Sequence, residues 1–279
     1  MKNSKIEWCD STWSPVTGCY HNCEYCYARR IANRFGAHIK NYNYEFVHDV
    51  AEKWETTTYQ DDCVTVESKR TCPYPFDFEP TFHRYRLNEP QKWKKPQTIF
   101  VCSMADLFGE WVPDEWIQEV FSACEKAKQH RYLFLTKNPA RYLKLAKAEM
   151  LPFNENFWYG STATGPDVEA FFSEVHNTFV SIEPLLEPFK NAGVYGIHKY
   201  TSWAIIGAET GNRAGKVVPE REWIEDIVGA FHGEGKPVFM KDSLLPIMGE
   251  GNMRREFPWG RREESTVRGR KMAKRVITK

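Results

Sequence analysis

The chain has 279 residues, of which 42% are hydrophobic and 15% aromatic, including ten tryptophans, and this composition excludes disorder over its whole length. The net charge of +1 indicates no class of partner by itself. The first residues lack the apolar segment of a secretory signal, and no stretch approaches the roughly 20 apolar residues of a membrane span, so we expect a cytoplasmic protein with no membrane partner.

Three of the eight cysteines lie close together near the N-terminus, in the run PVTGCYHNCEYCYARR (residues 15–30). In a reducing compartment a tight group of cysteines indicates metal or redox chemistry, while scattered cysteines are mostly buried small hydrophobes. The spacing of Cys19, Cys23 and Cys26 is C-x3-C-x2-C, and a helical stretch follows from Tyr27 to Phe35. Iron–sulfur clusters are held by cysteine thiolates, and the usual [4Fe-4S] cluster takes four of them. Three ligands therefore leave one iron open to a substrate or cofactor.

Residues 37–97 lack a clean hydrophobic period and are rich in Tyr, Thr, Glu, Lys and Pro. We expect a partly ordered insertion or lid here. Cys63 and Cys72, with eight residues between them, leave open a second metal site, although their spacing matches no common ligand pair.

From residue 98 onward, short apolar runs alternate with amphipathic stretches. Each run has the length and composition of a strand buried on both faces. The runs are TIFVCSMAD (98–106), YLFLTK (132–137), FWYGST (157–162), TFVSIEP (178–184), SWAIIGAE (202–209) and PVFMKD (237–242). This alternation predicts an α/β fold with parallel strands, either an open sheet or a (β/α) barrel.

Two helices between these runs have clear patterns. Asp114 is the expected cap of the first, whose apolar positions are Ile117, Val120, Phe121, Cys124 and Ala127. The second is expected to open near Pro219, to carry Trp223, Ile224, Ile227, Val228 and Phe231 on one face, and to stop at Gly233 and Gly235.

Polar residues stand where the predicted strands end. Active sites of parallel α/β folds gather at that edge, so these side chains are expected to converge, although any one of them is equally explained by loop chemistry or helix capping. They are Ser103, Asp106, Thr136, Lys137, Ser161, Thr162, Glu183, Glu209, Lys241 and Asp242.

The cysteine run GCYHNCEYCYARR resembles the cluster loop of the radical S-adenosylmethionine (radical SAM) superfamily, C-x3-C-x-φ-C with φ aromatic, and Tyr25 occupies φ. CEYCYAR is similar to the same loop in spore photoproduct lyase and related DNA-repair enzymes. The wider chain resembles the phage Gp37/Gp68 family of radical SAM-like proteins over most of residues 6–245, excluding 37–85 and the basic tail. The similar stretches are WSPVTGC, LNEPQKWKKPQTIFVCSMADLFGEWVP, FLTKNPARY, SIEPLLEP and IIGAETG.

This resemblance implies a partial or full (β/α) barrel of radical SAM type over residues 1–253, followed by a basic tail at 254–279. It also implies a [4Fe-4S] cluster on Cys19, Cys23 and Cys26. In such enzymes S-adenosylmethionine (SAM) chelates the open iron, and one electron from a donor such as flavodoxin or ferredoxin releases a 5′-deoxyadenosyl radical that abstracts hydrogen from the substrate.

Further roles are carried over by position. The Tyr25 backbone is expected to meet adenine. Ser103, Met104, Ala105 and Asp106 stand where the superfamily has a G-G-E-like motif that contacts the SAM amine, from which S-M-A-D departs. Ser161 and Thr162 are placed for the ribose hydroxyls, Lys137 or Lys241 for the SAM carboxylate, and Glu183 completes the cofactor-binding set. GAE at 207–209 follows a late strand and is interpreted as a substrate-side or structural element.

Cys102 has two interpretations. A thiol at a strand end facing a radical site can donate a hydrogen atom to a product radical, as a cysteine does in the spore photoproduct enzymes. Strand alternation, however, puts Cys102 on the same side as Phe100, which favours core packing.

Two other hypotheses compete with an enzyme. Cys19, His21, Cys23 and Cys26 could form a closed zinc site in a binding module, although the single residue on each side of His21 makes joint tetrahedral coordination awkward. Residues 254–279 hold ten Lys/Arg against three Glu, which favours contact with DNA or RNA phosphates. Phe257 and Trp259 beside these charges are expected to stack on bases, so a nucleic acid or nucleotide is the expected substrate class.

Overall fold

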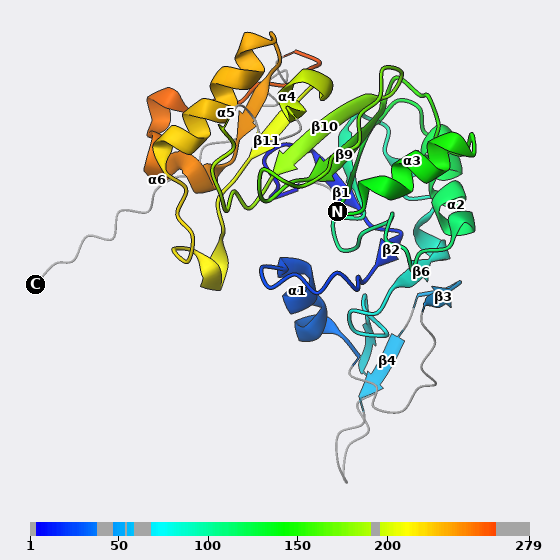
Figure 1. Cartoon of the computed structure of the whole chain (residues 1–279). Coiled ribbons are helices and arrows are strands. Elements are labelled where there is room, and N and C mark those ends of the chain that lie inside the picture. The colour runs from blue at the N-terminus through cyan, green and yellow to red at the C-terminus, as the bar shows by residue number, and fades with distance from the viewer. Residues whose placement is uncertain (1–3, 38–46, 54, 59–67, 191–195, 261–279) are drawn as a thin grey trace, which may run out of the picture.

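The computed structural model describes residues 4–37, 47–53, 55–58, 68–190 and 196–260. A parallel sheet of seven strands dominates it, and this sheet curls into a half-barrel (Figure 1). Its order is β1 (Ser11–Trp13), β7 (Thr98–Val101), β8 (Arg131–Thr136), β9 (Phe157–Thr162), β10 (Asn177–Ile182), β11 (Ala204–Ile206) and β12 (Val238–Met240). The predicted α/β fold with parallel strands is confirmed in the form of a partial barrel.

Alternation along the strands separates two apolar faces. One face is covered by helices and carries Ile99, Val101, Tyr132, Phe134, Val180, Ile182, Ala204, Ile206, Val238 and Met240. The other face, on the inside of the curl, carries Phe100, Leu133, Trp158, Phe179, Ile205 and Phe239. The strands are thus buried on both sides, which explains why each reads as a nearly continuous apolar run.

The outer face is covered by α2 (Asp114–Glu125), α3 (Pro139–Lys147) and α5 (Arg221–Gly233) (Figure 1). The apolar faces predicted for α2 and α5 are buried, apart from Trp223 and Val228, which are half-buried. The prediction that Asp114 caps α2 is wrong, because Pro113 holds the N-cap position. Asp114 is instead the first helical residue and accepts a hydrogen bond from Arg141 at 2.6 Å.

The alternation of strands and helices is incomplete. Residues 163–176, between β9 and β10, form no helix, and the α-helix described between β10 and β11 is the short α4 (Ile197–Tyr200). The other helices of the described residues include α1 (Tyr27–Phe35), α6 (Leu245–Met248) and the 3-10 turns η1 (Arg84–Arg86), η2 (Pro90–Lys92), η4 (Gly211–Arg213), η5 (Asp242–Leu244) and η6 (Glu250–Asn252). None of the helices in the described segments has the length and apolar composition needed to cross a bilayer.

The described parts of the stretch 37–97 form strands. They are β3 (His48–Val50), β4 (Glu55–Thr58), β5 (Ser68–Thr71) and β6 (Thr81–His83). β4 and β5 form a hairpin, while β6 pairs with both β3 and β2 (Val16–Thr17) in a second sheet. Phe82 and Trp93 belong to the main core, so the C-terminal part of the expected insertion is built into the barrel.

One cysteine of the suggested second metal pair, Cys72, falls within the described residues. Cys72 is buried, and its thiol donates to the carbonyl oxygen of Phe35 at 3.6 Å. Cys63 lies outside the described residues.

The barrel domain extends beyond residue 253. The Met240 amide donates to the Arg254 carbonyl at 2.8 Å, and the Glu256 amide donates to the Val238 carbonyl at 3.1 Å. Residues 254–260 therefore lie against β12, and only residues 261–279 of the expected basic tail fall outside the described structure.

Candidate functional site: a cysteine loop facing a cavity

The loop that carries the three cysteines is fixed at both ends. At its start the Gly18 amide donates to the Met104 carbonyl at 2.9 Å, and the Cys19 amide donates to the Phe78 carbonyl at 3.1 Å. At its end Cys26 is the N-cap of α1, and its sulfur accepts a hydrogen bond from the Arg29 amide at 3.4 Å. The helix predicted from Tyr27 to Phe35 is confirmed to the residue.

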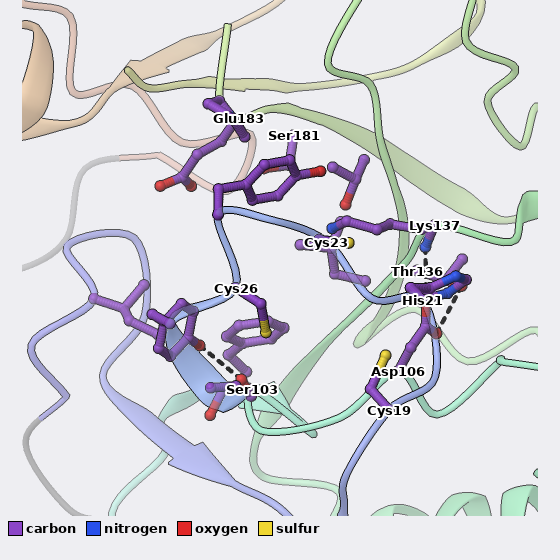
Figure 2. Close-up of a pocket in the computed structure, with 18 of the residues that line it drawn as sticks. Cys19, His21, Cys23, Cys26, Ser103, Asp106, Thr136, Lys137, Ser181 and Glu183 are labelled. Atoms are coloured by element: carbon purple, nitrogen blue, oxygen red, sulfur yellow. Dashed lines mark hydrogen bonds and ion pairs between the residues drawn. The ribbon is translucent and has the colours of Figure 1, made fainter. Parts of the chain in front are cut away.

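The three thiols face one cavity of about 360 Å³ at the carboxyl edge of the sheet (Figure 2). Parallel strands end at the same edge, and this brings side chains distant in sequence to one place. The structure gathers there most of the predicted site residues, namely Cys19, Cys23, Tyr25, Cys26, Ser103, Asp106, Lys137, Thr162, Glu183 and Lys241. Cys102, Met104 and Ser161 do not line the cavity.

Thr162 and Ser161 were expected to act together, but strand alternation separates them. Thr162 lines the cavity. Ser161 is fully buried, and its hydroxyl oxygen accepts a hydrogen bond from the Phe171 amide at 2.9 Å. Only Thr162 is therefore placed for contact with a ligand. Ser181 on β10 also lines the cavity, although the sequence interpretation did not assign it to the site. Ser181 lies two residues before Glu183, and side chains two residues apart in a strand point to the same side, so this spacing could have identified it.

Cys102 lies in the core, but the alternation argument that favoured this was wrong. β7 ends at Val101, and Cys102 has a positive φ of 56°, so the alternation stops there. Phe100 lines the cavity, whereas Cys102 packs in the cluster of the helix-covered face. Burial raises the pKa of the Cys102 thiol to about 12. Because it is buried away from the cavity, Cys102 is not placed to donate hydrogen to a substrate radical.

Met104 has a supporting position next to the cysteine loop. Its side chain packs with Ala28, Ala32 and Phe78 beneath α1. Its carbonyl accepts the hydrogen bond from Gly18, so the S-M-A-D segment holds the loop through its backbone.

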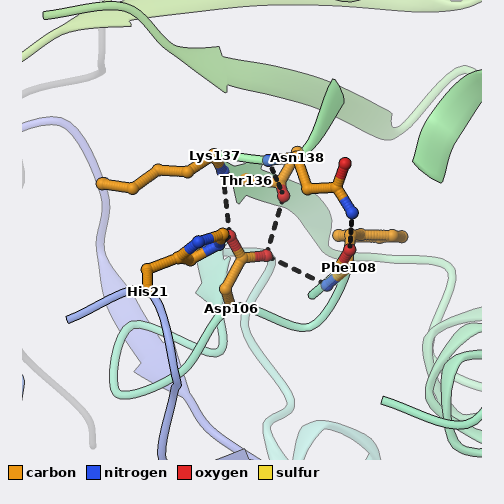
Figure 3. A network of polar contacts seen from close by, with 6 residues as sticks. All are labelled: His21, Asp106, Phe108, Thr136, Lys137 and Asn138. Atoms are coloured by element: carbon orange, nitrogen blue, oxygen red, sulfur yellow. Dashed lines mark hydrogen bonds and ion pairs between the residues drawn. The ribbon is translucent and has the colours of Figure 1, made fainter. Parts of the chain in front are cut away.

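Asp106 is the centre of a hydrogen-bond network that joins the loop to the sheet (Figure 3). One carboxylate oxygen accepts bonds from His21 Nε2 and the Lys137 amide, both at 2.8 Å. The other accepts bonds from the Thr136 hydroxyl at 2.8 Å and the Phe108 amide at 3.0 Å. Burial alone would raise the pKa of Asp106, but these bonds and the nearby His21 outweigh it and lower the pKa.

The network changes the role expected for Asp106. A carboxylate has about four lone-pair sites, and four protein donors occupy those of Asp106. It lines the cavity, as predicted, but has little capacity left for an amine of a ligand.

Two lysines line the cavity, and they differ in their partners. Lys241 is paired with Glu183 at the strand side of the cavity. Lys137 places its Nζ 5.6 Å from the centre of the Tyr25 ring, a cation–π distance. The cavity is also lined by Trp8 and Phe100, which the sequence interpretation did not assign to the site.

The described side chains do not form a closed site for a single zinc ion. Four zinc ligands surround one ion at about 2.0–2.3 Å, so they must lie close together. Within the described residues no group of three or more His, Cys, Asp or Glu side chains is arranged to hold one metal ion, and His21 is bonded to Asp106. The cysteine ligands of a [4Fe-4S] cluster bind separate irons and are spaced more widely.

The three cysteines are free thiols beside a cavity with room for a larger group. Burial raises the pKa of the Cys19 thiol to about 12, so ligation must displace its proton. The donor set therefore fits three-thiolate ligation of an iron–sulfur cluster.

A family described as "Protein of unknown function (DUF5131)" matches residues 3–244 of the chain. No curated protein and no solved structure matches the chain.

Proposed function

The chain belongs to the DUF5131 family, and we propose that it is a radical SAM enzyme that acts on a nucleic acid or nucleotide. One observation carries the proposal. The three free thiols of a C-x3-C-x2-C loop line one cavity at the carboxyl edge of a parallel half-barrel.

In this proposal Cys19, Cys23 and Cys26 hold a [4Fe-4S] cluster. When bound, the cluster would supply the single electron, received from a flavodoxin- or ferredoxin-like donor, that reductively cleaves the sulfonium of SAM to methionine and a 5′-deoxyadenosyl radical. The protein's own residues position SAM and the substrate and keep water away.

Lys137 is the better of the two predicted partners for the SAM carboxylate. Lys241 is already neutralised by Glu183. Lys137 extends into the cavity over Tyr25, and no carboxylate of the described residues forms an ion pair with it. Thr162 and Ser181 offer hydroxyls to the ribose from neighbouring strands.

The apolar walls suit radical chemistry because they limit competing reactions with solvent. Trp8, Phe100 and Phe78 line the cavity and are nearly fully buried.

Support for a nucleic acid substrate comes from charge and not from stacking. Phe257 and Trp259 are not free to stack on bases, because they pack on Trp203 inside the curl, with ring centroids 5.6 and 5.3 Å from it. Residues 261–279 hold eight Lys/Arg and two Glu, and this excess of positive charge favours phosphate contact.

The test is anaerobic reconstitution of the full chain followed by assays of iron, sulfide and the products of SAM. We expect about four irons and four sulfides per chain and cleavage of SAM to 5′-deoxyadenosine and methionine under strong reductant. Cys23→Ala is expected to abolish the uptake of iron and sulfide and the cleavage of SAM, because two thiolates cannot retain the cluster. DNA, RNA and nucleotides offered in turn then identify the substrate by faster cleavage.

Cys9→Ser is the matched control. Cys9 is a buried cysteine outside the cysteine loop that does not line the cavity, and its thiol donates to the Ile6 carbonyl, a bond that a serine hydroxyl is expected to replace. This variant should keep iron, sulfide and cleavage at wild-type levels. Wild-type protein that takes up no iron and sulfide under oxygen-free conditions contradicts the proposal.

A further inference from the structure

One side of α1 is open to solvent. The helix packs against the rest of the chain through Ala28 and Ala32, which are buried with Phe78. Another side is formed by the residues that follow Tyr27 at helical spacing, i+3, i+4, i+7 and i+8. Together with Tyr27 itself these are Arg30, Ile31, Arg34 and Phe35, and all are exposed. These five residues are the outward stripe of α1.

The outward stripe begins at the edge of the cavity. Tyr27 lines the cavity, and its hydroxyl donates to the Ser103 carbonyl at 2.6 Å, which holds the ring in place. From Arg29 onward α1 no longer lines the cavity, and the helix lies outside the half-barrel (Figure 1). A helix of nine residues is about 13 Å long, so the stripe continues for that distance from the cavity over the surface.

The outward stripe is positively charged. α1 holds three arginines and no acidic residue. Arg29 is half-buried and donates to a backbone carbonyl of the cysteine loop at 3.3 Å. Arg30 and Arg34 form no ion pair with a carboxylate of the described residues, and Glu24, an exposed acid of the cysteine loop, is paired with Arg213. Two positive charges one helical turn apart therefore face solvent without a partner among the described side chains.

These charges and the rings beside them match a nucleic acid strand. A guanidinium binds a phosphate through two parallel hydrogen bonds. Proteins that hold single strands combine cations along the backbone with aromatic rings that stack on bases. The outward stripe has both, because Tyr27 and Phe35 keep 44% and 42% of their surface exposed. The aromatic rings of the C-terminal segment pack inside the curl and do not offer this.

The dimensions favour a single strand over a duplex and over a partner protein. The cavity at the start of the stripe has a volume of about 360 Å³, which suits one nucleotide and not a base pair. A base in a duplex must leave its stack before it can enter such a pocket. A stable protein interface takes about 800 Å² from each partner, which one side of a nine-residue helix does not supply.

We propose that the outward stripe of α1 binds a single strand of DNA or RNA and leads it into the cavity past Tyr27. Arg30 and Arg34 bind phosphates of the strand, and Phe35 stacks on a base. This rests on the proposed function, because that function supplies a nucleic acid substrate.

The test measures binding of fluorescein-labelled oligothymidylate and oligouridylate to the full chain by fluorescence anisotropy at several salt concentrations. Each phosphate contact on a single strand contributes about −0.7 to the slope of log K against log salt concentration. Arg30→Gln/Arg34→Gln removes two contacts, so its slope should be shallower than that of the wild type by about 1.4. Its binding at low salt should be about 10-fold weaker.

Phe35→Ala separates stacking from charge. Loss of one stacked base should weaken binding by about 5- to 100-fold. Because Phe35 carries no charge, the slope against salt should remain that of the wild type. A Phe35→Ala chain with wild-type affinity would overturn the stacking role of the stripe.

Lys144→Gln/Lys147→Gln is the matched control. Both lysines are exposed in the last turn of α3, which covers the outer face of the sheet and does not line the cavity. The control removes the same amount of positive charge and should keep the wild-type affinity and slope. If the double arginine variant fails to fold by circular dichroism, Arg30→Gln and Arg34→Gln replace it singly, and each should make the slope shallower by about 0.7.

The results that overturn the inference are distinct. A wild type that binds no single strand, or binds a duplex more tightly, overturns it. So does a double arginine variant with the wild-type slope, or a lysine control that loses as much slope. Binding of an acidic flavodoxin-like protein that is lost in the arginine variant, while strand binding persists, makes the stripe a protein interface and also overturns it.

Iron, sulfide and SAM cleavage are assayed on the same preparations, so that the inference and the proposed function are judged separately. Strand binding through the outward stripe in a chain that takes up no cluster refutes only the radical SAM chemistry. Cluster uptake and SAM cleavage together with an unchanged slope in the arginine variant refute only the inference.

Discussion

Gly18 shows how one residue without a side chain allows the cysteine loop to form. Its φ is +84°, and a Cβ there would lie 2.1 Å from the carbonyl oxygen of Glu79. That contact is with backbone, so no side-chain rotation relieves it. Cys19 follows immediately, and its direction towards the cavity depends on this close approach of two chain segments.

Gly18→Ala is therefore expected to lower the free energy of unfolding by more than about 1 kcal/mol, because the strained φ and the backbone clash add. Urea unfolding measures the change, and reconstituted iron per chain should fall with it. Gly229→Ala is the control. Gly229 lies inside α5 with open space where a Cβ would be, so alanine should stabilise the chain by about 0.5–1 kcal/mol. Equal effects of the two substitutions would refute this account of Gly18.

At the scale of elements, Asp106 ties three segments together. It lies after β7 and accepts bonds from His21 in the cysteine loop and from Thr136 and Lys137 at the end of β8. Each of these segments ends at the carboxyl edge of the sheet. The carboxylate thus fixes the distance between the loop and the strands that face it.

Asp106→Asn should loosen this junction. Both carboxylate oxygens accept from donors, so the asparagine NH2 must face a donor in either orientation. We expect a loss of about 3 kcal/mol in the free energy of unfolding, as when a buried charged network is broken. If Asp106 positions the loop, its substitution should also change the electron paramagnetic resonance spectrum of the proposed cluster after reduction. A substitution that only lowers stability would leave that spectrum unchanged.

Asp49→Asn is a suitable comparison, because Asp49 pairs with Arg84 on the surface with a side chain that is 40% exposed. Its loss should cost less than about 1 kcal/mol and leave the spectrum unchanged. An Asp106→Asn chain with wild-type stability and spectrum would rule out the positioning role.

At the scale of the whole molecule, the C-terminal segment completes the inner face of the half-barrel. Residues 254–260 return to β12, and Phe257 and Trp259 cover the inner aromatic cluster. Trp203 donates from its indole nitrogen to the Glu256 carbonyl at 3.0 Å. Arg131 lies over the Trp259 ring at 4.0 Å.

Two truncations test whether residues 254–260 belong to the domain. A chain ending at 253 should have a free energy of unfolding at least about 3 kcal/mol lower than a chain ending at 260, because two large aromatic side chains leave the inner cluster. Urea unfolding of both chains measures this, and equal stability would contradict the assignment of residues 254–260 to the domain.

The chain that ends at residue 260 also tests nucleic acid contact. Removal of residues 261–279 takes away eight Lys/Arg and should weaken binding to DNA and RNA and flatten its dependence on salt. Unchanged affinity and salt dependence would remove the support that the tail gives to a nucleic acid substrate.

Much of this architecture could be predicted because its signals are local. The apolar runs became strands since they are buried on both faces, and the apolar faces of α2 and α5 are where the spacing put them. β1, of only three residues, and α3 were missed because short or weakly periodic segments give little signal. The 37–97 stretch was misjudged because Phe82 and Trp93 are buried by distant segments that no local pattern reveals.

The sequence by itself determined the cysteine spacing, the parallel order of strand and helix, and the polar residues at strand ends, since each depends on neighbours along the chain. Only the tertiary structure decided which of these side chains face the cavity. Cys102 packs in the core because of a single positive φ, and Asp106 accepts hydrogen bonds from four donors. The reason is physical: burial and hydrogen-bond partners come from segments far apart in the chain, and these become neighbours only when the sheet curls.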